Sequence, residues 1–321
     1  MHHVTLAGQF PAHTLEKLRA ALPADRYTVR LIDDQAQYDR MTDAEIIVLR
    51  IFKAQADVIE RNPNLRIILR AGAGFDKVDI AAAGARGIYV TNTPGANAYS
   101  VAELAVMLML AVGRRLYCHV RCMDRGEWSK DTFLEESSCL KGKRVGILGV
   151  GHIGRYVARL VRAFGATVQY YDAFRLPHEQ EEEYGLPYVP LDELFRTSQI
   201  VSVHVPMLEE TRNLVNRERI ARMPDGAMII NTARGGVVDE AAVLEAIRSG
   251  KLSGAGFDAT VEEPLPADSP LLAEPRVVVT PHIGAAVGDI ADAFIPMLAE
   301  SLFDYAAGKT PRYLVNGQYL K

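Results

Sequence analysis

Residues 143–173 read KRVGILGVGHIGRYVARLVRAFGATVQYYDA and contain the clearest structural pattern of the chain. A short apolar run leads into the spacing Gly149-x-Gly151-x-x-Gly154, and an amphipathic stretch and a second β-branched run follow. The pattern predicts a strand, a tight turn, a helix and a second strand. Gly149 would permit the turn, Gly151 would let a pyrophosphate approach the backbone, and Gly154 would let the helix pack closely on the strand. We therefore expect a dinucleotide to bind here.

The residue that ends the second run is Asp172, at the distance of about twenty residues that dinucleotide-binding units show. A carboxylate at this position should accept hydrogen bonds from the adenosine ribose and repel a 2′-phosphate, which favours NAD over NADP. Arg175 keeps the alternative open, because an arginine near the ribose could receive that phosphate.

The alternation of apolar runs and helical stretches continues on both sides of this stretch. Strands are expected at 4–6, 27–31, 46–49, 65–69, 88–90, 144–148, 167–171, 200–205, 227–231, 254–257 and 276–280, and helical stretches include 154–164, 240–249 and 290–307. Apolar strands separated by helices indicate parallel sheets covered on both faces. We expect an α/β protein with two Rossmann-like, doubly wound parallel-sheet domains and an active site in the cleft between them.

The domain boundaries are expected near Asn97 and Gly288. Residues 98–287 would form the NAD-binding domain. Residues 1–97 plus 288–321 would form a discontinuous substrate domain, because the final segment is too short to fold alone.

The composition excludes several classes of protein. The 321 residues are 49% hydrophobic and 24% charged with a net charge of −4, and no lysine-rich tract suggests a nucleic-acid surface. The longest apolar run, 104–112, is too short to span a bilayer, and the N-terminus lacks a signal peptide, so we expect neither membrane nor nucleic acid as a partner. The odd count of three cysteines fits a cytoplasmic protein. Cys118 and Cys122 lie one helical turn apart, but no second pair completes a zinc site, and we expect no metal.

Three polar residues follow expected strand ends in the second domain: Arg234, Glu263 and His282. Because ligands of open parallel sheets bind beyond the carboxyl ends of the strands, all three could converge on one site. Each alone also has an ordinary interpretation, as a surface arginine, a helix-cap carboxylate or a turn histidine.

In their sequence context and order, these residues resemble those of the D-isomer-specific 2-hydroxyacid dehydrogenases. The resemblance covers about residues 44–316, and within the family the 3-phosphoglycerate dehydrogenases look most similar. It is carried by RAGAGFDKVD, NTPGANAYSVAEL, GILGVGHIG, HVPMLEETRNL, NTARGGVVDE, GFDATVEEP and TPHIGA.

The resemblance implies an NAD-dependent oxidoreductase that transfers a hydride between nicotinamide and carbon 2 of a D-2-hydroxy acid or 2-keto acid. His282 would be the general acid and base, Glu263 would orient its imidazole and favour the protonated form, and Arg234 would bind the substrate carboxylate and carbonyl. The resemblance also implies a set of cofactor-binding residues: Gly149, Gly151, His152, Ile153, Gly154, Asp172, Val205, Pro206, Thr232, Ala233, Asp258 and Gly284.

The pentapeptide GAGFD occurs twice, at 72–76 and at 254–258. The resemblance makes the first copy a substrate loop, in which Ala73 and Gly74 present backbone N–H groups to a carboxylate. The second copy is expected to be a strand of small residues that ends at the nicotinamide pocket. Because the flanking residues differ, we interpret the identity as coincidence.

The substrate itself is left open by the sequence. Arg50 and Arg70, with Lys53, could hold a substrate phosphate or form surface salt bridges, and Phe52 could either close an apolar lid or pack into its domain. The substrate could be 3-phosphoglycerate, or the protein could be a hydroxypyruvate or glyoxylate type of reductase or a phosphite dehydrogenase. A formate dehydrogenase is not expected, since Glu263 stands where those enzymes carry glutamine.

Two further expectations concern regulation and assembly. No additional regulatory domain follows Lys321, so serine feedback through such a domain is not expected. The segment 117–140, which contains the single tryptophan, Trp128, corresponds to a dimer arm in the family and indicates a homodimer, with packing inside one chain as the alternative. A non-enzymatic role as an NAD(H)-sensing protein resembling the corepressors of this fold is the alternative of a different class.

Overall fold

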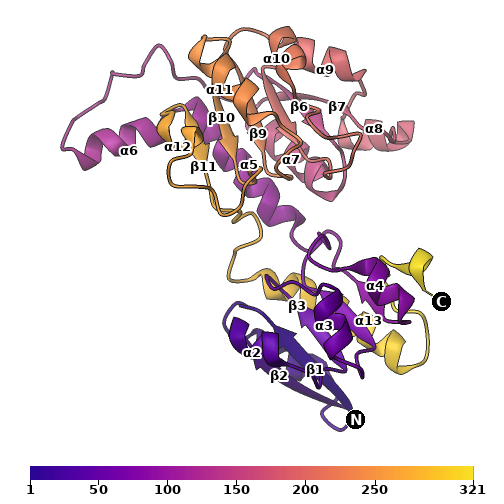
Figure 1. The fold of residues 1–321 in the computed structure, drawn as a ribbon. Coiled ribbons are helices and arrows are strands. Elements are labelled where there is room, and N and C mark those ends of the chain that lie inside the picture. Colours follow the sequence, from indigo (N-terminus) through magenta and orange to yellow (C-terminus); the bar gives the residue numbers. More distant parts are fainter. Residues whose placement is uncertain (321) are drawn as a thin grey trace. The chain divides into compact units, whose positions relative to one another are not determined.

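The structure is a computed structural model that describes residues 1–320. The chain divides into two compact units (Figure 1). The first contains Met1–Asn97 and the segment that begins at Ala285, and the second is Ala98–Gly284. The return to the first unit therefore lies three residues before the boundary expected from the sequence.

The first unit contains a five-stranded parallel sheet in the order β2-β1-β3-β4-β5. Its strands are β1 His2–Ala7, β2 Tyr27–Ile32, β3 Ile46–Leu49, β4 Ile67–Arg70 and β5 Tyr89–Thr91. Its helices are α1 Thr14–Ala21, α2 Gln35–Arg40, α3 Ala56–Arg61, α4 Ile80–Ala85 and α13 Ile290–Ala306, with a 3-10 turn at Gly317–Tyr319.

Two apolar clusters cover the two faces of this sheet. The apolar side of α13 repeats at intervals of three and four residues, and it packs with α1 on one face. Asn316 fastens the C-terminal segment to β5, because its side chain accepts from the amide of Val90 (2.9 Å) and donates to the carbonyl of Ile88 (2.8 Å). The discontinuous segment is thus part of the core of the first unit.

The second unit contains a six-stranded parallel sheet in the order β11-β10-β9-β8-β6-β7. Its strands are β6 Arg144–Leu148, β7 Thr167–Tyr171, β8 Ile200–Val203, β9 Ala227–Asn231, β10 Leu252–Phe257 and β11 Val277–Val279. Its helices are α5 Ala98–Gly113, α6 Leu116–Asp124, α7 His152–Ala163, α8 His178–Tyr184, α9 Leu191–Thr197, α10 Arg217–Arg222, α11 Glu240–Arg248 and α12 Pro270–Ala273. The expected doubly wound α/β architecture is confirmed in both units.

Close backbone packing explains the second GAGFD. A Cβ on Gly254 would lie 2.5 Å from the carbonyl oxygen of Arg276, and one on Gly256 would lie 3.0 Å from the side chain of Leu108 on α5. Larger residues would separate β10 from β11 and from α5, which covers it. The first GAGFD forms a loop after β4, so the two copies have different structural roles.

No helix within residues 1–320 is long and apolar enough to cross a membrane. Within the same residues, no group of three or more His, Cys, Asp and Glu side chains could hold a metal ion.

Candidate active site

The glycine-rich turn joins β6 to α7 and has the tight packing that its sequence requires. Gly149 has a φ of +97°, which disfavours any residue with a side chain, and its amide donates to the carbonyl of Tyr171 (2.9 Å). A Cβ on Gly154 would lie 2.1 Å from the carbonyl oxygen of Gly149, so only glycine lets α7 begin this close to β6. Gly151, in contrast, would meet no atom within 4 Å, so its backbone faces open space.

These groups fit the phosphates of a dinucleotide. α7 begins at His152 without a side-chain cap, which leaves its first N–H groups and the positive end of its dipole to a ligand. Asp172 lies beside the turn, where its carboxylate accepts from the amides of Val150 (2.8 Å) and Phe174 (3.0 Å). The contact of Asp172 with a ribose stays a prediction.

The remaining residues expected at the cofactor follow β8 and β9. His204, Val205 and Pro206 come directly after β8. Thr232 and Ala233 come after β9 and are buried, and the hydroxyl of Thr232 has no hydrogen-bond partner among the described residues. A bound ligand would satisfy this buried hydroxyl, as it would the free amides of α7.

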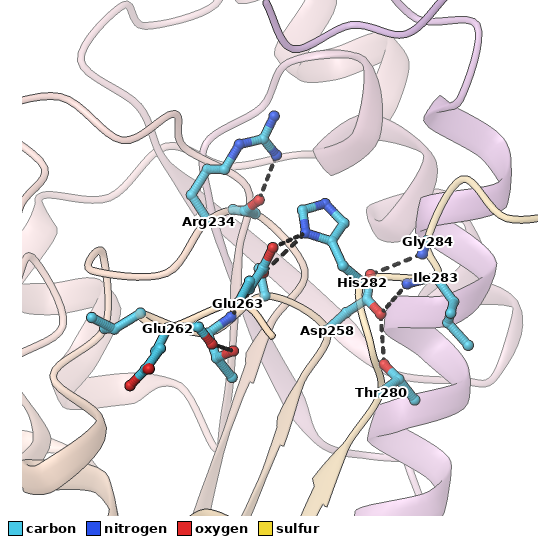
Figure 2. Close-up of polar contacts among 12 residues, drawn as sticks. Arg234, Asp258, Glu262, Glu263, Thr280, His282, Ile283 and Gly284 are labelled. Carbon is cyan, nitrogen blue, oxygen red and sulfur yellow. Dashed lines mark hydrogen bonds and ion pairs between the residues drawn. The ribbon is translucent and has the colours of Figure 1, made fainter. Parts of the chain in front are cut away.

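Glu263 and His282 form the central pair of the site (Figure 2). The Nδ1 atom of His282 lies 2.9 Å and 3.0 Å from the two carboxylate oxygens of Glu263. Both side chains are exposed, His282 to 46% and Glu263 to 41%. A carboxylate on Nδ1 fixes the ring orientation and leaves Nε2 to exchange a proton.

A second carboxylate, that of Asp258, holds the turn that carries His282. It accepts from the hydroxyl of Thr280 (2.6 Å) and from the amides of Ile283 (2.8 Å) and Gly284 (2.8 Å), as Figure 2 shows. His282 itself has a φ of +54°, an uncommon conformation that this network maintains. Asp258 and Gly284 were both expected at the cofactor. In the structure the amide of Gly284 donates to the carboxylate of Asp258, and this hydrogen bond gives both residues a role in holding the turn.

Arg234 lies on the loop after β9, which two features hold in place. The side-chain amide of Asn231 donates to the carbonyls of Arg234 (3.0 Å) and Ala259 (3.2 Å). A Cβ on Gly235 would lie 2.0 Å from the carbonyl oxygen of Thr260, so glycine lets this loop contact the segment that leads to Glu263. The structure thus brings Arg234, Glu263 and His282 to one end of the sheet of the second unit (Figure 2).

Asn231 and Thr280 position the loop of Arg234 and the turn of His282, a role that was not predicted from the sequence. Each is a polar residue at or next to a strand end, and each is the first residue of a motif quoted above, NTARGGVVDE or TPHIGA. That position was the available signal, but the contacts of Asn231 with Ala259 and of Thr280 with Asp258 join residues that are distant in sequence.

The expected substrate residues of the first unit have different environments. Phe52 is buried and packs on Tyr38, with ring centroids 4.9 Å apart, so core packing rather than a lid describes it. Arg70 donates to the carbonyl of Leu49 (3.0 Å), and Arg50 donates to the carbonyl of Gln9. Ala73 and Gly74 lie on a partly exposed loop, where the carbonyl of Ala73 accepts from Asn92 (2.7 Å).

Comparison with known proteins defines the class. Residues 106–284 match the NAD-binding domain of the D-isomer specific 2-hydroxyacid dehydrogenases. The chain belongs to this family, and it is an NAD-dependent oxidoreductase that acts on 2-hydroxy acids and the corresponding 2-keto acids.

Particular relatives differ in their substrates. The chain is 43% identical over 265 residues to a hydroxypyruvate reductase of Thermotoga maritima. The aligned region covers 81% of this chain and 84% of the relative. It is 40% identical to a D-3-phosphoglycerate dehydrogenase of Archaeoglobus fulgidus over 84% of this chain, but it spans only 51% of that longer relative. The crystal structure of the TT0316 protein from Thermus thermophilus superimposes with a TM-score of 0.85 at 34% identity, covering 98% of this chain and 99% of that one.

Proposed function

We propose that this protein uses NADH to reduce a small, unphosphorylated 2-keto acid to the D-2-hydroxy acid, as a hydroxypyruvate or glyoxylate type of reductase. The observation that carries the proposed chemistry is the Glu263–His282 pair, held at the end of the sheet beside Arg234. Reduction of a keto acid needs a cation that binds the substrate carboxylate and a group that donates a proton, and Arg234 and His282 can supply these.

The proposed steps follow from the chemistry of these side chains. The guanidinium of Arg234 binds the planar carboxylate and polarises the carbonyl, for which its fork of donors is suited. The nicotinamide, when bound, supplies the hydride that adds to carbon 2. His282 gives the proton at Nε2 to the carbonyl oxygen, and Glu263 stabilises the protonated ring before the transfer. In oxidation, His282 takes the proton back.

We propose that the cofactor lies along the ends of β6, β7, β8 and β9. The pyrophosphate would contact Gly151 and the first amides of α7, at His152 and Ile153, and the ribose would contact Asp172. Val205 and Pro206 would line the adenosine side, and Thr232 and Ala233 the nicotinamide side.

The preference for an unphosphorylated acid is supported by the cations of the first unit. Arg50 and Arg70 both donate to backbone carbonyls, and a substrate phosphate would have to compete with these bonds. Ile51, beside Arg50, presents an exposed apolar side chain from a backbone with a φ of +69°. The Ala73–Gly74 loop is proposed to bind the substrate carboxylate through its N–H groups.

Initial rates of NADH oxidation with phosphohydroxypyruvate, hydroxypyruvate, glyoxylate and pyruvate at equal concentrations test this proposal. We expect kcat/KM for the best unphosphorylated acid to equal or exceed that for phosphohydroxypyruvate. A preference of about 100-fold for phosphohydroxypyruvate, worth about 2.7 kcal/mol in the transition state, would instead assign 3-phosphoglycerate as the substrate of the reverse reaction.

We further propose a homodimer formed through α6. This helix and the loop after it extend away from the sheet of the second unit (Figure 1). They expose large apolar side chains: Leu116, Tyr117, Val120, Met123 and Trp128. Sedimentation velocity should show a dimer that Val120→Arg dissociates and that Asp124→Ala, on the same helix, leaves intact.

We also propose a cytoplasmic location. The free state of all three cysteines supports a reducing compartment, and cell fractionation checks the location.

A further inference from the structure

A buried carboxylate lies on the first helix after Asp172, the residue expected at the ribose. Glu181, on α8, has a side chain only 8% exposed, and it binds Arg175 through both oxygens. The Nε atom of Arg175 donates to Oε1 (2.8 Å), and Nη2 donates to Oε2 (2.9 Å). This is a bidentate, charge-assisted pair.

The pair is fixed by its surroundings. The fully buried Tyr170, on β7, donates its hydroxyl to Oε1 of Glu181 (2.7 Å) and accepts from the amide of Leu176 (2.8 Å). The guanidinium of Arg175 also lies 5.0 Å from the ring centroid of Tyr188. The hydrogen bonds from Arg175 lower the pKa of Glu181 to about 2, so Glu181 stays ionised at neutral pH.

Arg175 stands three residues after Asp172, on the same turn. The amide of Phe174, between them, donates to Asp172 (3.0 Å), so the turn folds back toward the carboxylate. The side chain of Arg175 is still 60% exposed. A guanidinium in this position could receive a 2′-phosphate on the ribose, if Glu181 did not already hold its Nε and Nη2 groups and pair with its charge.

We propose that Glu181 is a positioning residue for cofactor choice, which holds Arg175 in an ion pair and so withholds from NADP the cation that would bind its 2′-phosphate. Asp172 repels that phosphate, and Glu181 removes the compensating attraction. The inference rests on the proposed placement of the adenosine ribose at Asp172.

The substitution Glu181→Gln tests the ion pair with little change in side-chain size. The amide keeps an acceptor for the hydroxyl of Tyr170, but its NH₂ group faces the Arg175 donors, so the bidentate contact is lost. In an Asp172→Ala background, which removes the repulsion, the freed guanidinium can turn to the phosphate.

Isothermal titration calorimetry with adenosine 2′,5′-bisphosphate and with AMP measures the phosphate site without any catalytic step. In the Asp172→Ala background, we expect Glu181→Gln to tighten binding of the bisphosphate about tenfold and to change AMP binding by less than about twofold. Adding Arg175→Ala should cancel the gain. Tyr170→Phe, which removes a neighbouring hydrogen bond but leaves the ion pair, should produce no gain.

The inference is overturned if Glu181→Gln changes both ligands equally, or if the gain survives Arg175→Ala. If Glu181→Gln misfolds and loses AMP binding, Glu181→Asp is used as the second test. It moves the carboxylate away from Arg175 by one methylene, and it should also tighten binding of the bisphosphate but not of AMP. The NAD affinity of the single variant Asp172→Ala distinguishes failure of the proposed ribose site from failure of the inference about Glu181. If Asp172→Ala binds NAD as tightly as the wild type, the ribose does not contact Asp172, and both proposals are rejected. If Asp172→Ala binds NAD more weakly but Glu181→Gln does not tighten binding of the bisphosphate, only the inference about Glu181 is rejected.

Discussion

At the scale of single residues, two carboxylates support His282 in different ways. Glu263 contacts the imidazole itself and is proposed to assist its proton transfer, whereas Asp258 hydrogen-bonds the hydroxyl of Thr280 and the amides of Ile283 and Gly284 and holds the turn. The first effect should appear in the proton transfer and the second in the folding of the turn. Substitutions should therefore distinguish them.

Substitution of His282, the proposed proton donor, should strongly reduce turnover without loss of cofactor binding. We expect His282→Gln to lower kcat for keto acid reduction by about 10²- to 10⁴-fold, because the general acid is gone. Glu263→Gln should lower kcat by about tenfold or more, since a charge-assisted hydrogen bond becomes a neutral one. Steady-state kinetics combined with NADH titration check both values. Wild-type kcat in His282→Gln would refute the assignment.

His204 should make the protein sensitive to acid. Burial lowers its pKa to about 3, and its Nε2 atom lies 2.8 Å from the hydroxyl of the buried Ser202. As the pH falls below about 6.5, the unfolded chain takes up a proton that folded His204 does not, so stability is lost. Between pH 7.5 and pH 5 this loss is on the order of 2 kcal/mol.

Urea denaturation of the wild type and of His204→Gln at both pH values measures this contribution. The variant should show the smaller difference in unfolding free energy between pH 7.5 and pH 5, because glutamine does not titrate. Equal differences in the two proteins would mean that His204 is already accessible to protons in the folded state.

At the scale of elements, two glycines at the junction of β6 and α7 have different roles, because Gly154 is needed for packing and Gly151 is proposed to contact only the ligand. Gly154→Ala should both destabilise the fold, by about 1–3 kcal/mol, and weaken NADH binding, because its Cβ would lie 2.1 Å from the carbonyl oxygen of Gly149. Gly151→Ala is the matched control. Its Cβ meets nothing in the protein and its φ is −61°, so it should weaken NADH binding alone.

Thermal melts and NADH titrations of the two variants provide the measurement. If Gly151→Ala binds NADH as tightly as the wild type, the pyrophosphate does not approach this backbone.

The elements themselves could largely be predicted from the sequence. Strands such as 144–148 and 227–231 occur at the residues expected, because a parallel strand buried on both faces must be continuously apolar. The position of Arg234, Glu263 and His282 at strand ends was also predictable. The ion pair of Arg175 and Glu181 and the network of Asp258 were not, because each depends on which side chains the folded loops bring together.

At the scale of the whole molecule, the second unit has its own cores on the two faces of its sheet. A fragment of residues 98–284 should therefore fold cooperatively and bind NADH with an affinity near that of the full chain. It should not reduce a keto acid, because the proposed carboxylate-binding loop at 72–76 belongs to the first unit. Calorimetry and an NADH oxidation assay of the fragment check this, and turnover by the fragment would contradict the proposed role of that loop.

The bonds of Asp258 to Thr280, Ile283 and Gly284 extend to the last residue of the second unit. His282 is therefore carried by the same body that carries the glycine-rich turn. The proposed proton donor and the proposed cofactor-binding turn thus belong to one unit, and their relative position is set when that unit folds. The relative position of the two sites is thus fixed once per molecule, and each turnover has to order only NADH and the substrate within them.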